Sequence, residues 1–99
     1  MALTPEGRVK KAVREWLKAH GIWHFMPVSN GMGRMGVSDI IGCYQGRFLA
    51  IETKAPGKIK NVTPGQAQFI CEVRAAGGVA IVIDDVSQLD KEFGGHENV

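Results

Sequence analysis

The most constraining feature of the sequence is a pair of strand-like runs that meet at Gln45-Gly46. Residues 39–44 and 47–54 are rich in β-branched and aromatic side chains, and a two-residue connection that ends in glycine is typical of a β-hairpin. The two runs are therefore expected to be antiparallel neighbours. Pairing outward from the turn brings the start of the first run, near Asp39, opposite the end of the second run, near Glu52.

The segments before and after this hairpin predict two helices. Thr4-Pro5 and Thr63-Pro64 each place an N-capping residue before a proline at the first helical position. Apolar side chains then recur at helical spacing as far as Gly21 in one segment and Gly77-Gly78 in the other. We therefore expect helices that begin at these prolines and end before these glycines.

Two further runs predict strands. Residues 22–26 form a short β-branched and aromatic run that ends at Pro27, and residues 79–83 are wholly apolar. A fully apolar run of this length is typical of a central strand covered on both faces. The element order is then α-β-β-β-α-β, which predicts an α/β fold with a mixed sheet flanked by helices and a crossover helix before the last strand.

Length and composition predict a single cytosolic domain. The 99 residues leave room for one core, expected over about residues 4–83 and followed by an acidic C-terminal tail, 84–99, with one short helical turn. No apolar run approaches the roughly 18 residues that span a bilayer, and no signal-peptide core follows Met1. In a reducing compartment Cys43 and Cys71 are expected to be two buried thiols rather than a disulfide.

The net charge of +2 is unevenly divided along the chain. Residues 1–83 hold eleven basic and five acidic side chains, whereas the stretch after Ile83 holds five acids and a single base, Lys91. The positive charge of the body of the domain indicates an anionic partner. A solvated basic face on the first helix explains the charge equally well, and it would consist of Arg8, Lys10, Lys11, Arg14 and Lys18.

Side chains that can bind a metal gather at one end of the predicted hairpin. Alternation along the second strand places Glu52 and Lys54 on the same face, and the hairpin brings Asp39 close to Glu52. Two carboxylates a few ångströms apart repel each other unless one is protonated or a cation binds between them. Mg²⁺ and Mn²⁺ prefer such oxygen ligands, so the pair predicts a divalent-metal site.

Glu6 is a third acid that points to this site. It precedes Val9 and Val13 by three and seven residues, so it lies on the apolar stripe of the first helix. One explanation is structural, because a negative charge near a helix N-terminus is favourable. The other is functional, with the first turn of the helix above the carboxylate end of the hairpin.

Three segments of the chain carry a family resemblance: Gly36-Val37-Ser38-Asp39-Ile40, Phe48-Leu49-Ala50-Ile51-Glu52-Thr53-Lys54 and Thr63-Pro64-Gly65-Gln66. Together they closely resemble the VRR-NUC branch of the PD-(D/E)xK nucleases, over about residues 4–83. The resemblance implies a restriction-endonuclease-like core. Ser38 stands where many relatives have a proline before the aspartate, a difference that changes local stiffness but removes no ligand.

The resemblance also implies a metal-dependent deoxyribonuclease that hydrolyses phosphodiester bonds. Asp39, Glu52 and the backbone carbonyl of Thr53 would hold Mg²⁺ or Mn²⁺, which activates a bound water and neutralises phosphate charge. Lys54 would orient that water or stabilise the transition state. The implied catalytic set is Glu6, Asp39, Glu52, Lys54 and Gln66, and the expected DNA contacts are Arg34, Lys58 and Lys60.

The expected substrate is branched DNA, with a four-way junction as the first choice. Paired cuts across a junction require two sites, which a homodimer with two-fold symmetry supplies. The basic residues lie where they would meet phosphates, and no long basic recognition helix is present, so recognition of DNA shape is favoured. The alternatives are a flap or nicking nuclease in DNA repair, or a non-catalytic nucleic-acid binding module.

Three other patterns are given structural interpretations. Residues 31–36 spell G-x-G-x-x-G, but residues 37–46 contain two glycines and a strand-like pair rather than a helix, so no nucleotide cofactor is expected. His20 and His24 are four apart, yet Gly21 breaks the helix between them, which argues against zinc. Three aromatic residues are expected to pack in the core rather than to stack on bases: Trp16, Trp23 and Phe25.

Overall fold

The predicted hairpin is present in the computed structural model, which describes residues 3–28 and 34–94. Strands β2 (Ile40–Tyr44) and β3 (Arg47–Thr53) are antiparallel, with pairs running from Tyr44 and Arg47 at the turn to Ile40 and Ile51. Gln45 and Gly46 have φ angles of 51° and 81°, and left-handed conformations at both positions suit the type I′ turns that favour the natural strand twist. The turn therefore fixes the register that the sequence predicts.

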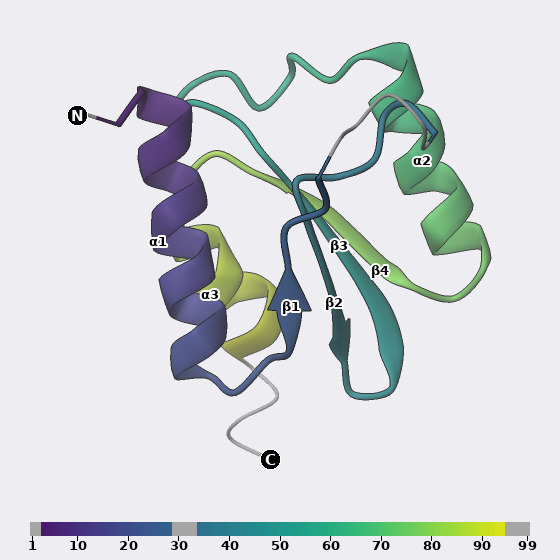
Figure 1. The fold of residues 1–99 in the computed structure, drawn as a ribbon, viewed down its shortest axis with the longest axis horizontal. Coiled ribbons are helices and arrows are strands. Elements are labelled where there is room, and N and C mark those ends of the chain that lie inside the picture. Colours follow the sequence, from purple (N-terminus) through teal and green to yellow (C-terminus); the bar gives the residue numbers. More distant parts are fainter. Residues whose placement is uncertain (1–2, 29–33, 95–99) are drawn as a thin grey trace.

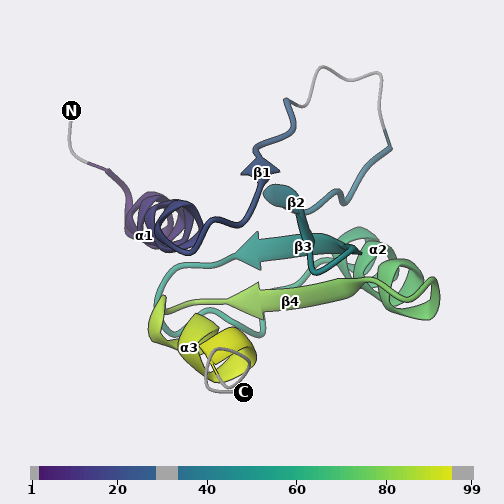
Figure 2. The same cartoon turned by 90° about the horizontal axis from the view of Figure 1, so that it is seen from below.

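The four-stranded mixed sheet has the order β1-β2-β3-β4 (Figure 1). Strand β1 (His24–Phe25) pairs antiparallel with β2, and β4 (Val79–Ile83) pairs parallel with β3. The predicted central position of the apolar run 79–83 is wrong, because β4 is an edge strand of the described sheet. Its apolar character has a different cause, since helices cover both of its faces (Figure 2). The strand expected over residues 22–26 pairs at two positions only.

The two predicted helices begin at their predicted caps. Helix α1 (Pro5–Ala19) starts after Thr4, whose hydroxyl oxygen accepts a hydrogen bond from Gly7 N over 3.0 Å. Helix α2 (Pro64–Ala75) starts after Thr63 in a capping box. The ends also agree with the sequence, since Gly21 and Gly77 follow the helices with positive φ angles.

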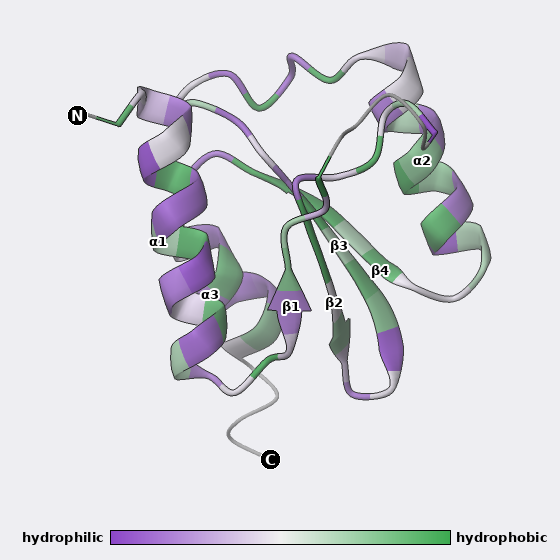
Figure 3. Ribbon diagram, in the orientation of Figure 1, coloured by the Kyte–Doolittle hydropathy of each residue, from purple (hydrophilic) through white to green (hydrophobic). Residues whose placement is uncertain are grey.

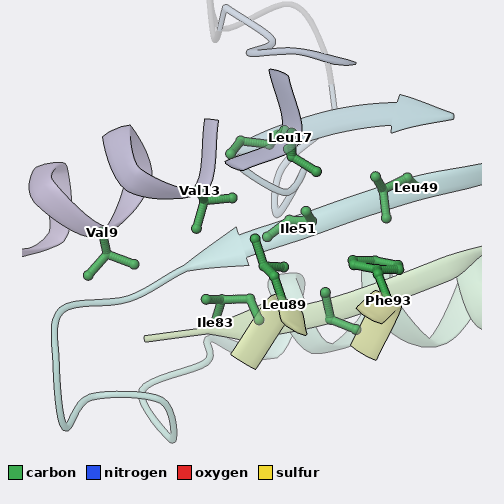
Figure 4. Packing of buried hydrophobic residues seen from close by; sticks show 10 residues of the cluster. Val9, Val13, Leu17, Leu49, Ile51, Ile83, Leu89 and Phe93 are labelled. Carbon is green, nitrogen blue, oxygen red and sulfur yellow. The ribbon is translucent and has the colours of Figure 1, made fainter. Parts of the chain in front are cut away.

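The core is divided between the two faces of the sheet. Helices α1 and α3 (Ser87–Phe93) cover one face, and α2 covers the β3–β4 part of the other (Figure 2). On α1 the apolar side chains are spaced to face the sheet, while polar side chains occupy the outer surface (Figure 3). The larger cluster, part of which Figure 4 labels, consists of Val9, Val13, Leu17, Ile40, Leu49, Ile51, Ile81, Ile83, Leu89 and Phe93. The smaller cluster consists of Ile41, Ala50, Phe69, Ile70 and Ala80.

The third helix corrects the expected end of the core at residue 83. The segment after β4 forms a seven-residue helix, and its Leu89 and Phe93 are buried in the larger cluster. Trp16 connects this helix to α1, because its indole Nε1 donates to Asp90 Oδ1 over 3.1 Å. The segment is rich in acidic residues, but its apolar residues Leu89 and Phe93 are four positions apart, which is the spacing of one helical face. Glu97, the last expected acid of the tail, lies outside the described residues.

Several side chains that were expected to be buried are exposed. Cys43 and Cys71 are free, exposed thiols, so the prediction of burial is wrong for both. Trp16 packs against the larger cluster as predicted, but Trp23 is 66% exposed and Phe25 is 46% exposed. These side chains of the sheet are exposed because α2 packs over β3 and β4 and does not cover β1 (Figure 2).

Among the helices of the described residues, none combines the length and the apolar character needed to cross a bilayer.

Candidate functional site

The register of the hairpin brings Asp39 and Glu52 together at one end of the sheet. Ile40 pairs with Ile51, so the next position along each chain places Asp39 beside Glu52. Asp39 is anchored by Thr53, whose backbone N–H and hydroxyl both donate to Asp39 Oδ2, over 3.0 and 2.8 Å. The second oxygen, Oδ1, lies 3.8 Å from the Lys10 ammonium of α1. The Asp39 carboxylate is thus held between β3 and α1.

Glu52 is the most deeply buried acid of this group, with 3% of its surface exposed. Its Oε2 accepts a hydrogen bond from Gln66 Nε2 over 3.1 Å and lies 3.6 Å from Lys54 Nζ. Its other oxygen, Oε1, is buried and has no hydrogen-bond partner among the residues that the structure describes. A buried carboxylate oxygen without a donor is unfavourable, so this atom is available to a ligand.

The environment of Glu52 raises the pKa of its carboxyl from 4.5 to about 7. Burial is the largest cause, because it removes water from the charged form. The negative charge of Asp39 raises the pKa further, and the positive charge of Lys54 opposes these effects. Near neutral pH the Glu52 carboxyl is therefore partly protonated, and a cation bound beside it would favour its ionised form.

Gln66 and Lys54 lie against Glu52 and complete the cluster. Gln66 lies at the third position of α2, and its Oε1 accepts hydrogen bonds from Lys54 Nζ and from the backbone N–H of Thr63, each over 3.0 Å. Lys54 is only 9% exposed, so its ammonium is held between Glu52 and Gln66 rather than extended into solvent. The structure therefore brings Glu52, Lys54 and Gln66 into direct contact, and the hairpin register places Asp39 beside Glu52.

Glu6 is near the cluster but is not bonded to it. Its negative charge makes the smallest of the contributions that raise the pKa of Glu52, which places it on the same side of the molecule. Within residues 3–28 and 34–94, no three acidic, histidine or cysteine side chains are close enough to form a ready-made metal cluster. Glu6 is therefore an outer residue of the site.

The residues that are present fit a hard divalent cation. Asp39 and Glu52 offer adjacent carboxylates, and the unpartnered Glu52 Oε1 is an oxygen donor that the protein leaves unused. Ser38 adds a second buried oxygen without a hydrogen-bond partner, next to Asp39 in the chain. A cation would neutralise the repulsion that raises the pKa of Glu52. This donor set is suited to Mg²⁺ or Mn²⁺ rather than to zinc, which prefers nitrogen and sulfur ligands.

The three predicted DNA contacts lie in two different settings. Lys58 and Lys60 are exposed on the loop between β3 and α2. Arg34 is instead folded onto α2, where its guanidinium is 2.8 Å from Glu72 Oε1 and 5.1 Å from the centre of the Phe69 ring. The ion pair raises the pKa of Arg34 and lowers the pKa of Glu72. One guanidinium nitrogen makes this contact, and the Arg34 side chain remains about half exposed.

Two polar contacts of the site region were not predicted from the sequence. Lys10 lies next to Asp39. The sequence signal for this contact is that Lys10 follows Glu6 by four residues, which puts the two side chains on one side of α1. Asp84, after β4, accepts a hydrogen bond from Gly57 N over 3.0 Å and so holds the basic loop against the sheet.

The glycine motif of residues 31–36 lies partly outside the described residues, which resume at Arg34. The segment after Gly36 enters β2 and not a helix, as the sequence predicts. Gly36 has a φ of 81° and packs against α2, where a Cβ would lie 2.4 Å from the backbone of Gly65. This contact fixes the segment that leads to Asp39 against the first turn of α2.

No model of a protein family matches this chain, and no curated protein sequence matches it.

Proposed function

We propose that this chain is a metal-dependent nuclease that cleaves DNA at the Asp39–Glu52 site. The observation that carries the proposal is the convergence of Asp39, Glu52 and Lys54 from two strands, with a buried carboxylate oxygen left without a partner. Burying Glu52 beside a second acid is unfavourable for a protein that has no use for it, since this raises the pKa of Glu52 to about 7. The finer fold proposed is the restriction-endonuclease-like core of the VRR-NUC nucleases.

Asp39 and Glu52, with the backbone carbonyl of Thr53, are the residues that would hold Mg²⁺ or Mn²⁺. When bound, such an ion lowers the pKa of a coordinated water and neutralises charge on the phosphate. Thr53 fixes the position of the Asp39 carboxylate through its two hydrogen bonds. Gln66 fixes one oxygen of Glu52 and leaves the other free to act as a ligand.

Lys54 supplies the positive charge that the reaction needs. Its ammonium is held by Gln66 Oε1 and lies 3.6 Å from Glu52 Oε2, so it is already oriented before substrate binds. A preoriented cation in a site that excludes water stabilises the negative charge that develops on the phosphate or orients the attacking water. Glu6 and Gln66 would position waters or a second metal at the outer side of the site.

The proposed substrate is branched DNA, cut by a homodimer, and a four-way junction is the first candidate. The support is the excess of basic side chains in residues 1–83, which would contact phosphates rather than read base edges. Lys58 and Lys60 are the exposed phosphate contacts proposed next to the site. A flap or nicking nuclease would use the same residues on a different DNA shape.

One experiment tests the activity and the DNA preference together. The purified chain is incubated with junction, flap and plain duplex DNA, with Mg²⁺, with Mn²⁺ and with a chelator, while sedimentation reports the oligomeric state. We expect divalent-dependent cleavage that is lost in Asp39→Asn and Glu52→Gln and retained in Glu92→Gln, which removes an exposed acid of α3. Unchanged activity in either site variant would exclude this site, and binding without any cleavage would favour a non-catalytic module.

A further inference from the structure

The sheet has an uncovered aromatic surface next to the site, at its β1 edge. Trp23 and Phe25 are 66% and 46% exposed, and their ring centroids lie 5.6 Å apart at an angle of 57°. Trp23 immediately precedes β1, and its carbonyl accepts a hydrogen bond from Cys43 N, so its position is fixed by the sheet. The pairing of this segment with β2 therefore holds two large aromatic side chains in an exposed position at the edge strand β1 (Figure 1).

The register places these rings on the same face as the candidate site. Phe25 pairs with Ile41, Ile41 pairs with Ala50, and Glu52 lies two residues after Ala50 on β3, so Phe25 and Glu52 lie on one face of the sheet. Two residues of a strand correspond to about 7 Å. A ligand that extends from Glu52 along this face therefore meets Phe25 first and then Trp23.

The other side of β1 forms the wall of a basic groove. A groove of about 670 Å³ lies between α1 and β1, and the alternation of the strand turns His24 and Met26 toward it. Four cations of α1 line it against one acid, Glu15: Lys10, Lys11, Arg14 and Lys18. A second hollow of about 660 Å³ shares Lys10 and Met26 with this groove and reaches Asp39. The groove is thus continuous with the candidate site.

We propose that this edge binds an unpaired segment of the nucleic-acid substrate, with bases stacked on Trp23 and Phe25 and phosphates along the cations of α1. This inference rests on the proposed function, which gives nucleic acid as the substrate. It adds that the β1 edge holds the substrate and that the bound segment is single-stranded. Aromatic faces and a positive groove on the two sides of one edge strand offer a single strand both stacking and phosphate contacts, because every unpaired base has a stacking face. Bases inside a duplex are already stacked and cannot use these rings.

Charge favours nucleic acid over a second copy of this chain as the occupant. A two-fold contact built on β1 would place the α1 groove of one copy next to the same groove of the other copy. The four cations and one acid that line the groove would then face an identical set of charges. Like charges in such a contact are unfavourable. The phosphate backbone supplies the opposite charge at regular spacing along the groove.

Tryptophan fluorescence tests stacking directly. The chain has two tryptophans, so Trp16→Phe leaves Trp23 as the only reporter. With Glu52→Gln added and no divalent metal present, oligothymidylate is expected to quench this fluorescence, and a duplex of equal length is expected to have little effect. Trp23→Ala and Phe25→Ala, each in the Glu52→Gln background, should weaken binding of labelled oligothymidylate by roughly 5- to 150-fold, the range found for the loss of one base–aromatic stack.

Matched variants separate this surface from general effects on the protein. Phe48→Ala removes an equally exposed aromatic side chain on β3, near the turn and two strands away, and should change affinity by less than about twofold. Trp23→Tyr, which keeps an aromatic face, should restore most of the affinity. Lys11→Gln in the groove should reduce the salt dependence of single-strand binding by about 0.7 per lost phosphate contact, while Lys91→Gln on α3 should leave it unchanged.

The outcomes are distinguishable from those of the cleavage experiment, because these measurements use a protein that cannot cleave. Unchanged fluorescence with oligothymidylate, or equal losses in Phe25→Ala and Phe48→Ala, would overturn the proposed surface even if the chain cleaves DNA. If Trp23→Ala and Phe25→Ala instead turn a dimer into a monomer in sedimentation and leave single-strand affinity unchanged, the face is a contact between copies and the proposal is wrong. Quenching by single strands without any nuclease activity would support this surface and contradict the proposed function.

Discussion

Gln66 donates its side-chain N–H to Glu52 Oε2 over 3.1 Å, and the same amide forms the capping box of α2. Its Oε1 accepts from both the Thr63 backbone and the Lys54 ammonium. One side chain therefore fixes the start of α2 and orients both the Glu52 carboxylate and the Lys54 ammonium next to it. The position of α2 on the sheet and the geometry of the site depend on the same residue.

Two variants of this capping box separate its structural role from its role in the site. Thr63→Ala removes the hydroxyl that accepts from Gln66 N and is expected to lower the free energy of unfolding by about 1 kcal/mol, with cleavage changed only a few-fold. Gln66→Ala also leaves Glu52 and Lys54 without their shared partner, so it should reduce cleavage by about 10- to 100-fold, as losses of orienting residues around metal ligands do. Thermal melts and single-turnover cleavage measure the two effects. Equal loss of cleavage in both variants would mean that Gln66 acts through the helix alone.

Glu52 should make the metal-free protein less stable as the pH rises. The pKa of this carboxyl is raised in the folded protein from 4.5 to about 7, so the folded state binds the proton more tightly than the unfolded state between these values. Unfolding free energy therefore falls as the pH increases from about 4.5 to above 7, by about 3 kcal/mol for a shift of this size. Urea unfolding at a series of pH values, with a chelator present, measures the change.

Glu52→Gln is the matched test of this pH dependence. It keeps the shape of the side chain and removes its titration, so the variant should lose most of the decline and become more stable than the parent above about pH 7. Glu92→Gln on the surface of α3 should keep the decline of the parent. A Glu52→Gln variant whose stability falls with pH as steeply as that of the parent would contradict the assignment to Glu52.

The sequence was sufficient to predict the center of the candidate site because local signals determine it. Gln45-Gly46 sets the turn, the turn sets the register, and the register places Asp39 against Glu52 without any long-range information. The capped start of α2 also follows from Thr63-Pro64, but the contact of Gln66 with the sheet does not. Its position in the site came from the family resemblance, and the structure supplies the geometry.

The exposed aromatic edge and the third helix could not be predicted because they depend on which elements cover which strands. Trp23 and Phe25 have the composition of core residues, and only the location of α2 over β3 and β4 leaves them bare. The reverse holds for Leu89 and Phe93, which lie among acidic residues and are nevertheless buried. Local apolar content indicates what can be buried, and tertiary packing decides what is buried.

Lys54 should contribute to the rate of cleavage more than to metal affinity. Its ammonium contacts Gln66 and Glu52, and neutral variants such as Lys54→Ala remove a positive charge without removing a metal ligand. At saturating Mn²⁺ we expect a 100- to 1000-fold lower cleavage rate, which is on the order found for the loss of one transition-state donor. The Mn²⁺ concentration that gives the half-maximal rate should change little. Lys58→Ala, an exposed loop variant, should affect DNA affinity and leave the saturated rate unchanged. A Lys54→Ala enzyme that recovers the full rate at high Mn²⁺ would show that Lys54 acts only on metal binding.

Gly36 and Gly57 form a natural pair for testing how the segment before Asp39 is held. Both have a φ of 81°, so alanine introduces the same backbone strain at each position, about 1–2 kcal/mol. They differ in their surroundings. A Cβ on Gly36 would lie 2.4 Å from the carbonyl carbon and oxygen of Gly65 and 2.9 Å from Gln66 N, whereas nothing lies within 4 Å of a Cβ on Gly57.

Gly36→Ala should therefore be clearly more destabilising than Gly57→Ala. Gly57→Ala is expected to lower the Tm by the strain alone, at about 4–8 °C for each kcal/mol in a domain of this size. Gly36→Ala must also push the backbone before Asp39 away from the first turn of α2, which displaces Asp39 relative to Gln66. We expect a Tm lower than that of Gly57→Ala by at least several degrees, and a loss of cleavage at temperatures where the variant is fully folded. Equal Tm values for the two variants would mean that the contact between Gly36 and Gly65 does not hold this part of the site.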